Sequence, residues 1–104
     1  MIITTLEYVP DKTITKHLGL VQGSTVRAKH AGRDIMAGVK NIFGGELKAY
    51  TELLQESREE AIERIKEQAL ETGANAILNV RFSTSSITQW ASEIYTYGTA
   101  VILE

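Results

Sequence analysis

The sequence has 104 residues, a formal net charge of −2 and no cysteine. Without cysteine, disulfides, thiolate metal ligands and cysteine nucleophiles are excluded. The slightly acidic charge balance offers no broad phosphate-binding surface, so nucleic acid is not expected as a partner. A hydrophobic content of 43% with a single proline predicts one folded domain over residues 1–104. No apolar run approaches about 18 residues and no signal peptide is evident, so we expect a cytoplasmic protein without a membrane partner.

The first third of the chain has the pattern of β-strands. Residues 2–5 form a short β-prone segment, and residues 9–12 (VPDK) predict a turn. Alternation of apolar and polar residues from 12 to 29 has two interpretations. It predicts either one long strand, bent or bulged near Gly23, or a hairpin that turns at residues 22–24.

Two consecutive helices are expected in the middle of the chain. Residues 31–43 have the apolar spacing of a short helix, which the pair Gly44-Gly45 separates sharply from the next one. Apolar residues recur at helical spacing from Glu46 onward, and Gly73 suits the position just past a helix C-terminus. Such a helix would span roughly 40 Å. Because this is long for so small a domain, part of the helix is expected to contact another subunit.

The last third of the chain returns to β structure. Residues 74–83 alternate as a strand, residues 83–92 (STSSITQWAS) are interpreted as a polar loop, and residues 93–103 form the last strand. Beyond Gly98 both faces of this strand are apolar, so helices or another subunit should cover the second face. Two strands, two helices and two strands predict a two-layer α+β fold, with an antiparallel β-sheet packed against one long and one short helix.

The two histidines, His17 and His30, are candidate metal ligands. Imidazole and carboxylate together suit zinc and similar ions, and Asp34, Glu46 or Glu7 could complete a site. The sequence lacks a local ligand motif such as HxH or HExxH, and the alternative is that both histidines are incidental. The glycines before Arg33-Asp34 and before Glu46 could expose helix N-termini to an anion, or could simply turn the chain.

Arg58 falls by its spacing close to the apolar face of the long helix and is expected to be partly buried. It would then need a carboxylate or carbonyl partner, in an inter-subunit ion pair, a structural anchor or a ligand site. Asn75, Asn79 and Arg81 share one predicted strand face, where they could line a polar pocket or a solvated edge. The many Ser and Thr residues occur in no nucleophile motif such as GxSxG, so no enzymatic activity is predicted.

Three segments of the sequence resemble a known family. They are TLEYVPDKTITKHLGLVQGSTVRAK, GGELKAYTELLQESREEAIERIKEQALETGANAILNVRF and YTYGTAVIL. Over nearly its whole length the chain resembles the YbjQ-like family of small bacterial and archaeal proteins, which carries the description "putative heavy-metal binding". The resemblance implies a two-layer α+β fold similar to the dodecin subunit, assembled as a ring-shaped homopentamer.

Taken with this resemblance, the sequence predicts a homopentameric binding module, or a multiple of the pentamer, that holds a metal ion or a small anionic ligand at subunit junctions. The candidate ligand-binding residues are Arg33, Asp34, Glu46, Arg58, Asn75 and Arg81, and the candidate metal ligands are His17 and His30. No cofactor other than a metal ion is implied. The alternative is a structural or protein-interaction ring without a small ligand, in which these polar groups would satisfy one another.

Overall fold

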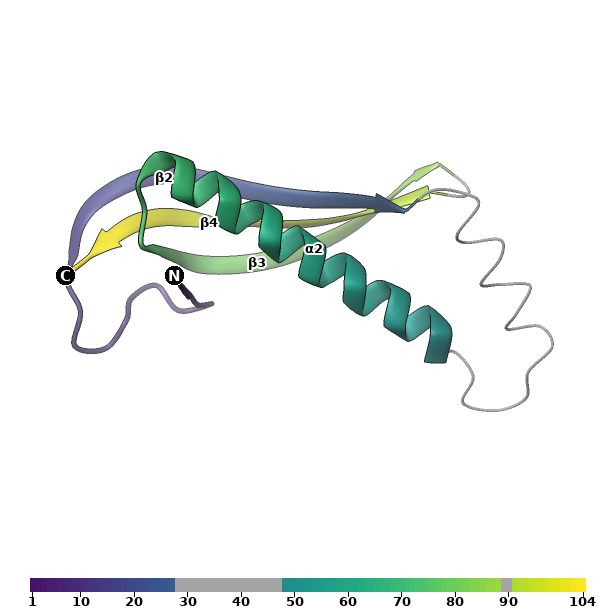
Figure 1. The fold of residues 1–104 in the computed structure, drawn as a ribbon, viewed down its shortest axis with the longest axis horizontal. Helices are drawn as coiled ribbons and strands as arrows, with labels where there is room; N and C mark the ends of the chain where they lie inside the picture. Colours follow the sequence, from purple (N-terminus) through teal and green to yellow (C-terminus); the bar gives the residue numbers. More distant parts are fainter. Residues whose placement is uncertain (28–47, 89–90) are drawn as a thin grey trace.

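The computed structural model describes residues 1–27, 48–88 and 91–104 (Figure 1). The expected short helix at 31–43 and the Gly44-Gly45 corner lie outside these residues. The described elements are β1 (Ile2–Ile3), β2 (Ile14–Arg27), α2 (Lys48–Thr72), β3 (Ala76–Thr88) and β4 (Ala91–Leu103). The strands form one sheet in the order β1-β3-β4-β2, with α2 lying across one face (Figure 1). The predicted α+β fold is confirmed.

The sheet is mixed rather than purely antiparallel. β4 pairs antiparallel with both β2 and β3, but β1 pairs parallel with β3, with Ile2 opposite Ala76. The prediction of an antiparallel sheet is therefore wrong at this edge. The segment after β1 crosses to the opposite edge of the sheet before β2 begins, so β1 and β2 are not hairpin partners. A strand of two residues has no sequence signal for its direction.

β2 is one continuous strand, so the alternative of a hairpin at residues 22–24 is wrong. Its irregularities lie between Ile14 and Lys16 and between His17 and Gly19, not at Gly23. Gly19 has a φ of +100°, in the left-handed region that favours glycine. Gly23 instead keeps regular register opposite Thr96.

β3 and β4 form a long hairpin in place of the predicted polar loop at residues 83–92. Ser83 pairs with Tyr95, and Ser86 pairs with Ser92. Residues 83–86 are exposed on both faces of the ribbon, so no hydrophobic alternation marks them as a strand. These residues form an arm of the sheet that is held by backbone pairing with β4 rather than by burial of their own side chains.

α2 matches the predicted long helix. It ends at Thr72, and Gly73 follows with a φ of +89°, while the backbone N–H of Gly73 donates to the carbonyl of Leu70. The buried side of the helix consists of Ser57, Ala61, Ile65 and Ala69, each 0% exposed. Ile65 and Ala69 pack on residues from β2, β3 and β4, including Val21, Ile77 and Ala100. Burial of each larger apolar side chain stabilises the fold by about 1.5–3 kcal/mol.

A second, smaller core lies on the other face of the sheet. It contains Ala76, Leu78, Val101 and Leu103, and Val9 packs against it. The segment that carries Val9 begins beside β3, where the N–H of Thr4 donates to the carbonyl of Ile77, and includes the predicted turn, in which the N–H of Lys12 donates to the carbonyl of Val9. The second face of the last strand is therefore covered here by the chain's own N-terminal segment, not by helices or another subunit as expected.

Candidate functional site

The helix leaves one side of the sheet open. α2 crosses the sheet obliquely (Figure 1) and contacts β2 extensively, β4 less and β3 least. Two hollows lie along α2 on this open side, and they share Arg58 and Phe82. The first, of about 330 Å³, is lined by Gln55, Arg58, Glu59, Ile62, Glu63 and Phe82. The second, of about 340 Å³, is lined by Leu54, Arg58, Phe82, Thr84, Ser85, Ser86, Ser92 and Ile94. We call the two together the Arg58–Phe82 groove.

Helical spacing and strand register build this groove. The α2 residues of the first hollow are Gln55, Arg58, Glu59, Ile62 and Glu63, which follow the i, i+3, i+4, i+7, i+8 pattern of one side of a helix. Phe82 is opposite Thr96, which is 0% exposed. α2 makes few contacts with β3, and Phe82 itself stays 46% exposed and lies at the junction of the two hollows.

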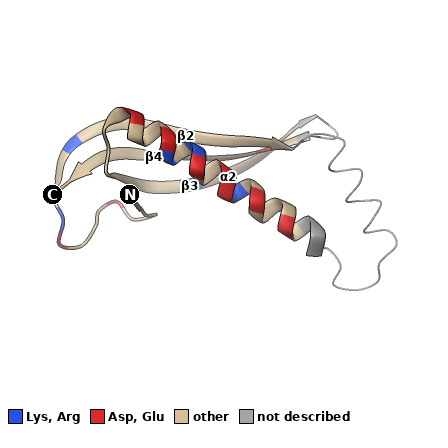
Figure 2. Cartoon of the chain, in the orientation of Figure 1, with Lys and Arg blue, Asp and Glu red and all other residues tan. Residues whose placement is uncertain are grey.

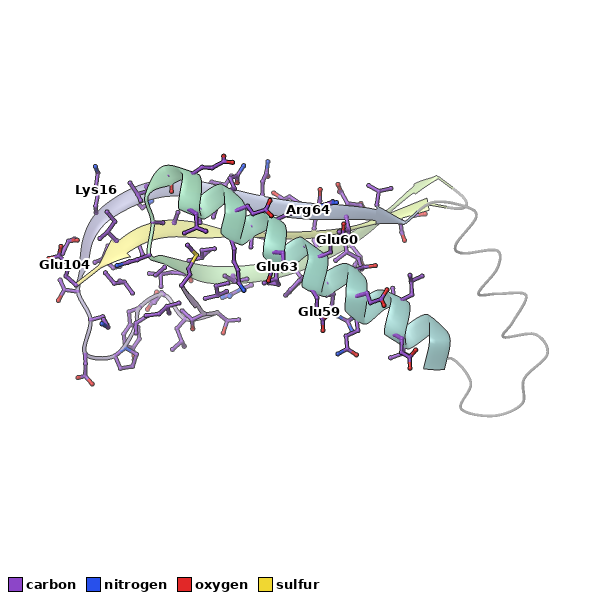
Figure 3. All side chains as sticks on the ribbon, in the orientation of Figure 1. Lys16, Glu59, Glu60, Glu63, Arg64 and Glu104 are labelled. Atoms are coloured by element: carbon purple, nitrogen blue, oxygen red, sulfur yellow. The ribbon has the colours of Figure 1, made fainter. Side chains whose placement is uncertain are left out.

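Arg58 is the only cation among the residues that line the groove. It is exposed rather than partly buried as expected, because its side of α2 faces the open side of the sheet. It makes no hydrogen bond or ion pair with the described part of the chain. Neighbouring charges on α2 are engaged: Lys66 pairs with Glu63 at 3.1 Å, and Arg64 pairs with Glu60 at 2.5 Å (Figure 3). The guanidinium of Arg58 is thus available to an anion.

Asn75 and Arg81 lie elsewhere and have structural partners. The Asn75 side chain donates to the Leu103 carbonyl at 2.9 Å and accepts from the Leu103 N–H at 2.7 Å. Arg81 donates to the carbonyls of Thr5 and Val80, each at 2.9 Å. A bulge between Leu78 and Arg81 shifts the alternation of side chains, so Asn75 and Arg81 do not share one face with Asn79, whose φ is +55°, and the alternative of a common polar pocket is wrong.

The candidate metal ligands are not brought together. His17 is exposed on β2, in register opposite Val101. His30 lies outside the described residues, as do Arg33, Asp34 and Glu46. Within residues 1–27, 48–88 and 91–104, no group of three or more His, Asp or Glu side chains is placed to hold a metal ion. Nor does this part of the chain contain a helix long and apolar enough to cross a bilayer.

Comparison with known proteins identifies the family to which the chain belongs. The YbjQ family model, described as "Putative heavy-metal-binding", matches residues 1–104. The chain belongs to this family. It is 66% identical to a UPF0145 protein of Hahella chejuensis over 104 residues, which is the full length of both chains. It is 60% identical over 96 residues to a UPF0145 protein of Acinetobacter baylyi, covering 92% of this chain and 89% of the relative.

Further matches are an archaeal relative and a solved structure of low sequence identity that shares the fold. A UPF0145 protein of Archaeoglobus fulgidus is 52% identical over 103 residues, covering 99% of this chain and 95% of the relative. A crystal structure from Pediococcus pentosaceus, described as a protein of unknown function in the DUF74 family, superposes with a TM-score of 0.67. It shares 16% identity and covers 100% of this chain and 98% of its own, which shows a common fold.

The family description directs attention to metals, and the described residues do not fit a heavy-metal site. The chain has no cysteine to supply the thiolates that soft metals prefer. Within the described ranges, the site with the clearest chemistry is instead the cationic and apolar groove around Arg58 and Phe82. Sequence reasoning found Arg58 but missed Phe82, whose place at the end of an alternating strand pattern gave no sign of a neighbouring helix.

Proposed function

We propose that this protein is a self-associating binding module that holds a small anionic ligand in the Arg58–Phe82 groove, without catalysing a reaction. The assembly is a ring-shaped homopentamer or a multiple of it, with subunits similar to dodecin, and the groove lies where subunits meet. The observation that carries the ligand proposal is the guanidinium of Arg58, which stands without a partner among the described residues in a hollow of ligand size.

The shape of the chain supports self-association. Its Cα radius of gyration is 16.9 Å, compared with about 13 Å for a compact domain of this length. Its accessible surface is 6890 Å², roughly 1,100 Å² more than the approximately 5,800 Å² of an ordinary monomer of 11.5 kDa. A stable interface removes about 800 Å² from each partner, so the excess is large enough for one.

Exposed apolar side chains also support self-association. Leu20 is 70% exposed, Leu70 62% and Val26 54%. Leu20 and Val26 lie on β2, at one edge of the sheet. Leu70 lies near the end of α2. Burial of these residues against a second copy would contribute favourable hydrophobic free energy, whereas an isolated chain leaves them in water.

The proposal takes an anion rather than a metal ion as the ligand. A guanidinium repels cations and matches carboxylate or phosphate oxygens. Multi-angle light scattering and elemental analysis of untagged protein test both parts of the proposal. We expect a pentamer or its multiple with less than one metal ion per chain. A monomer would contradict the proposed assembly. A stoichiometric metal ion that is bound by the wild type and lost in the variant His17→Ala/His30→Ala would contradict the proposal that the ligand is an anion.

A structural ring without any small ligand is the competing function. It predicts the same assembly but no bound anion, so molar mass does not distinguish it. The variant Leu54→Asp is measured for molar mass only, because Leu54 is half-buried on α2 and itself lines the groove, where the new acid would also repel an anion. We expect the charged side chain to dissociate the ring, and an unchanged molar mass would exclude this part of α2 from the interface.

A further inference from the structure

The groove also has features that select a class of anion. Resting on the proposed function, we infer that its ligand is an organic monocarboxylate with a flat or branched apolar body. The two requirements come from separate observations. The charges around Arg58 set the ionisation of the ligand, and the apolar side chains beside it set the nature of the rest of the molecule.

Charge favours a single negative group. The first hollow contains one cation, Arg58, and two acids, Glu59 and Glu63, and acidic residues recur along α2 with basic residues between them (Figure 2). Glu63 is partly neutralised by Lys66 at 3.1 Å, while the Glu59 carboxylate accepts only a long hydrogen bond of 3.4 Å from Gln55. A monocarboxylate satisfies the guanidinium in a bidentate contact. A second negative charge, as on a phosphate monoester, would meet the acids without a second cation.

The remaining lining favours an apolar body. Phe82 is 46% exposed and contributes to both hollows, and Ile62 is half-buried in the first of them. Leu54 and Ile94 line the second hollow, together with Thr84. A flat ring could stack on Phe82 while its carboxylate meets Arg58. Neither hollow offers the several cations that a sugar phosphate or a nucleotide requires.

The size of the groove is consistent with this class. The hollows measure about 330 and 340 Å³ and meet at Arg58 and Phe82. Each is at the lower end of the roughly 300–1,000 Å³ typical of small-molecule sites. A molecule with one ring and a short acidic side chain fits one hollow. Its carboxylate would lie at the junction, where the only cation of the lining is found.

The test is a titration of the assembled protein, followed by amide NMR or calorimetry, with four probes that separate the two requirements. Phenylacetate has both the charge and the ring, 2-phenylethanol lacks the charge, acetate lacks the ring, and phenyl phosphate carries a second charge. We expect saturable binding of phenylacetate, with shifts of amide signals around Phe82. The other three probes should bind at least tenfold more weakly.

Variants connect binding to the groove. Arg58→Gln should weaken phenylacetate binding at least tenfold, and Phe82→Leu should weaken it severalfold. Lys16→Gln removes an exposed cation at a distance from the groove and should leave binding unchanged, which controls for net charge. If Arg58→Gln does not fold, Phe82→Leu and Arg58→Lys carry the test, because the lysine keeps the charge but loses the bidentate geometry.

The outcomes separate this inference from the function on which it rests. Phenyl phosphate or acetate binding as tightly as phenylacetate, or equal binding by wild type and Arg58→Gln, would overturn the monocarboxylate inference. So would a wild type that binds none of the four probes. If such a protein nevertheless retains another small anion that Arg58→Gln loses, the binding module stands and only the ligand class is wrong. If no anion is retained, the proposed function fails as well.

Discussion

Gly23 of β2 lies directly beneath Ile65 of α2. A β-carbon on Gly23 would be 2.6 Å from the backbone nitrogen of Ile65, and it would also meet the carbonyl oxygen of Ala61. Real β-carbons do not approach backbone atoms so closely, and the obstacle is the helix backbone, which cannot rotate away as a side chain can. Glycine at this position therefore sets the distance between α2 and the sheet.

We predict that Gly23→Ala destabilises the protein by about 1–3 kcal/mol, since α2 must shift away from the sheet to admit the methyl group. Urea unfolding measures the change. The direction of the stability change is informative, because alanine in a strand is normally more stable than glycine. Ser83→Ala, at an exposed β3 position, is the control and should change stability by less than about 0.5 kcal/mol. A Gly23→Ala protein as stable as wild type would contradict the close packing.

The end of α2 depends on the left-handed conformation of Gly73. Because nothing lies within 4 Å of a β-carbon built there, backbone strain alone opposes a side chain. We predict that Gly73→Ala costs about 1 kcal/mol and that Gly73→Asn costs less, since asparagine tolerates this conformation better. Thermal unfolding of both variants checks the order. Equal stability of the alanine and asparagine variants would show that the C-terminal cap is not limiting.

Asn75 fastens the start of β3 to the end of β4 through its two hydrogen bonds to the backbone of Leu103. Asn75→Ala leaves a part-buried N–H and carbonyl without these partners, which should cost about 1–3 kcal/mol. Asn75→Asp keeps the acceptor for the Leu103 N–H but loses the donor to the carbonyl. Its stability at neutral pH should also fall, and chemical denaturation measures both. Wild-type stability of the alanine variant would mean that water replaces the side chain.

The outer edge of β2 is covered by side chains of α2. The N–H of Gln22 donates to Gln68 Oε1 at 2.6 Å, and Arg64 donates to the carbonyl of Ser24. Exposed edge groups are templates for unwanted strand pairing. We predict that Gln68→Ala raises the amide exchange rate of Gln22 about two- to tenfold, the range expected for the loss of one hydrogen bond. NMR measures the exchange rate of the Gln22 amide, and Glu67→Ala, one residue earlier on α2, is the control. Equal exchange rates in the two variants would contradict the protection of this edge by Gln68.

Local signals in the sequence predicted the elements that bury one face. The apolar spacing from Glu46 and the glycine at 73 predict a helix that the structure places at Lys48–Thr72. Alternation likewise predicts β3, and the two apolar faces beyond Gly98 predict that β4 is covered on both sides, as the two cores show. In these elements the buried residues are mostly apolar and the exposed residues are mostly polar, so the pattern in the sequence follows the pattern of burial.

The rest depends on contacts that no local pattern records. The arm at Ser83–Ser86 is held by backbone pairing and buries little, so its polar residues resemble a loop. The bulge at Asn79 shifts the alternation, which separates Asn75 from Arg81. The groove itself arises because α2 packs closely on β2 and only slightly on β3. The close approach of α2 to β2 requires Gly23 under Ile65, a tertiary contact that only the folded chain shows.

The central claim, that the Arg58 guanidinium holds a small anion in an assembled ring, is tested most directly by native mass spectrometry. Untagged wild-type protein and Arg58→Gln are to be purified in parallel and measured intact. We predict a pentamer or its multiple for both proteins, with a small organic mass retained by the wild type and absent from the variant. An identical retained mass in both would place the ligand elsewhere. If neither the wild type nor Arg58→Gln retains an added mass, the result would contradict the binding module and favour the structural ring.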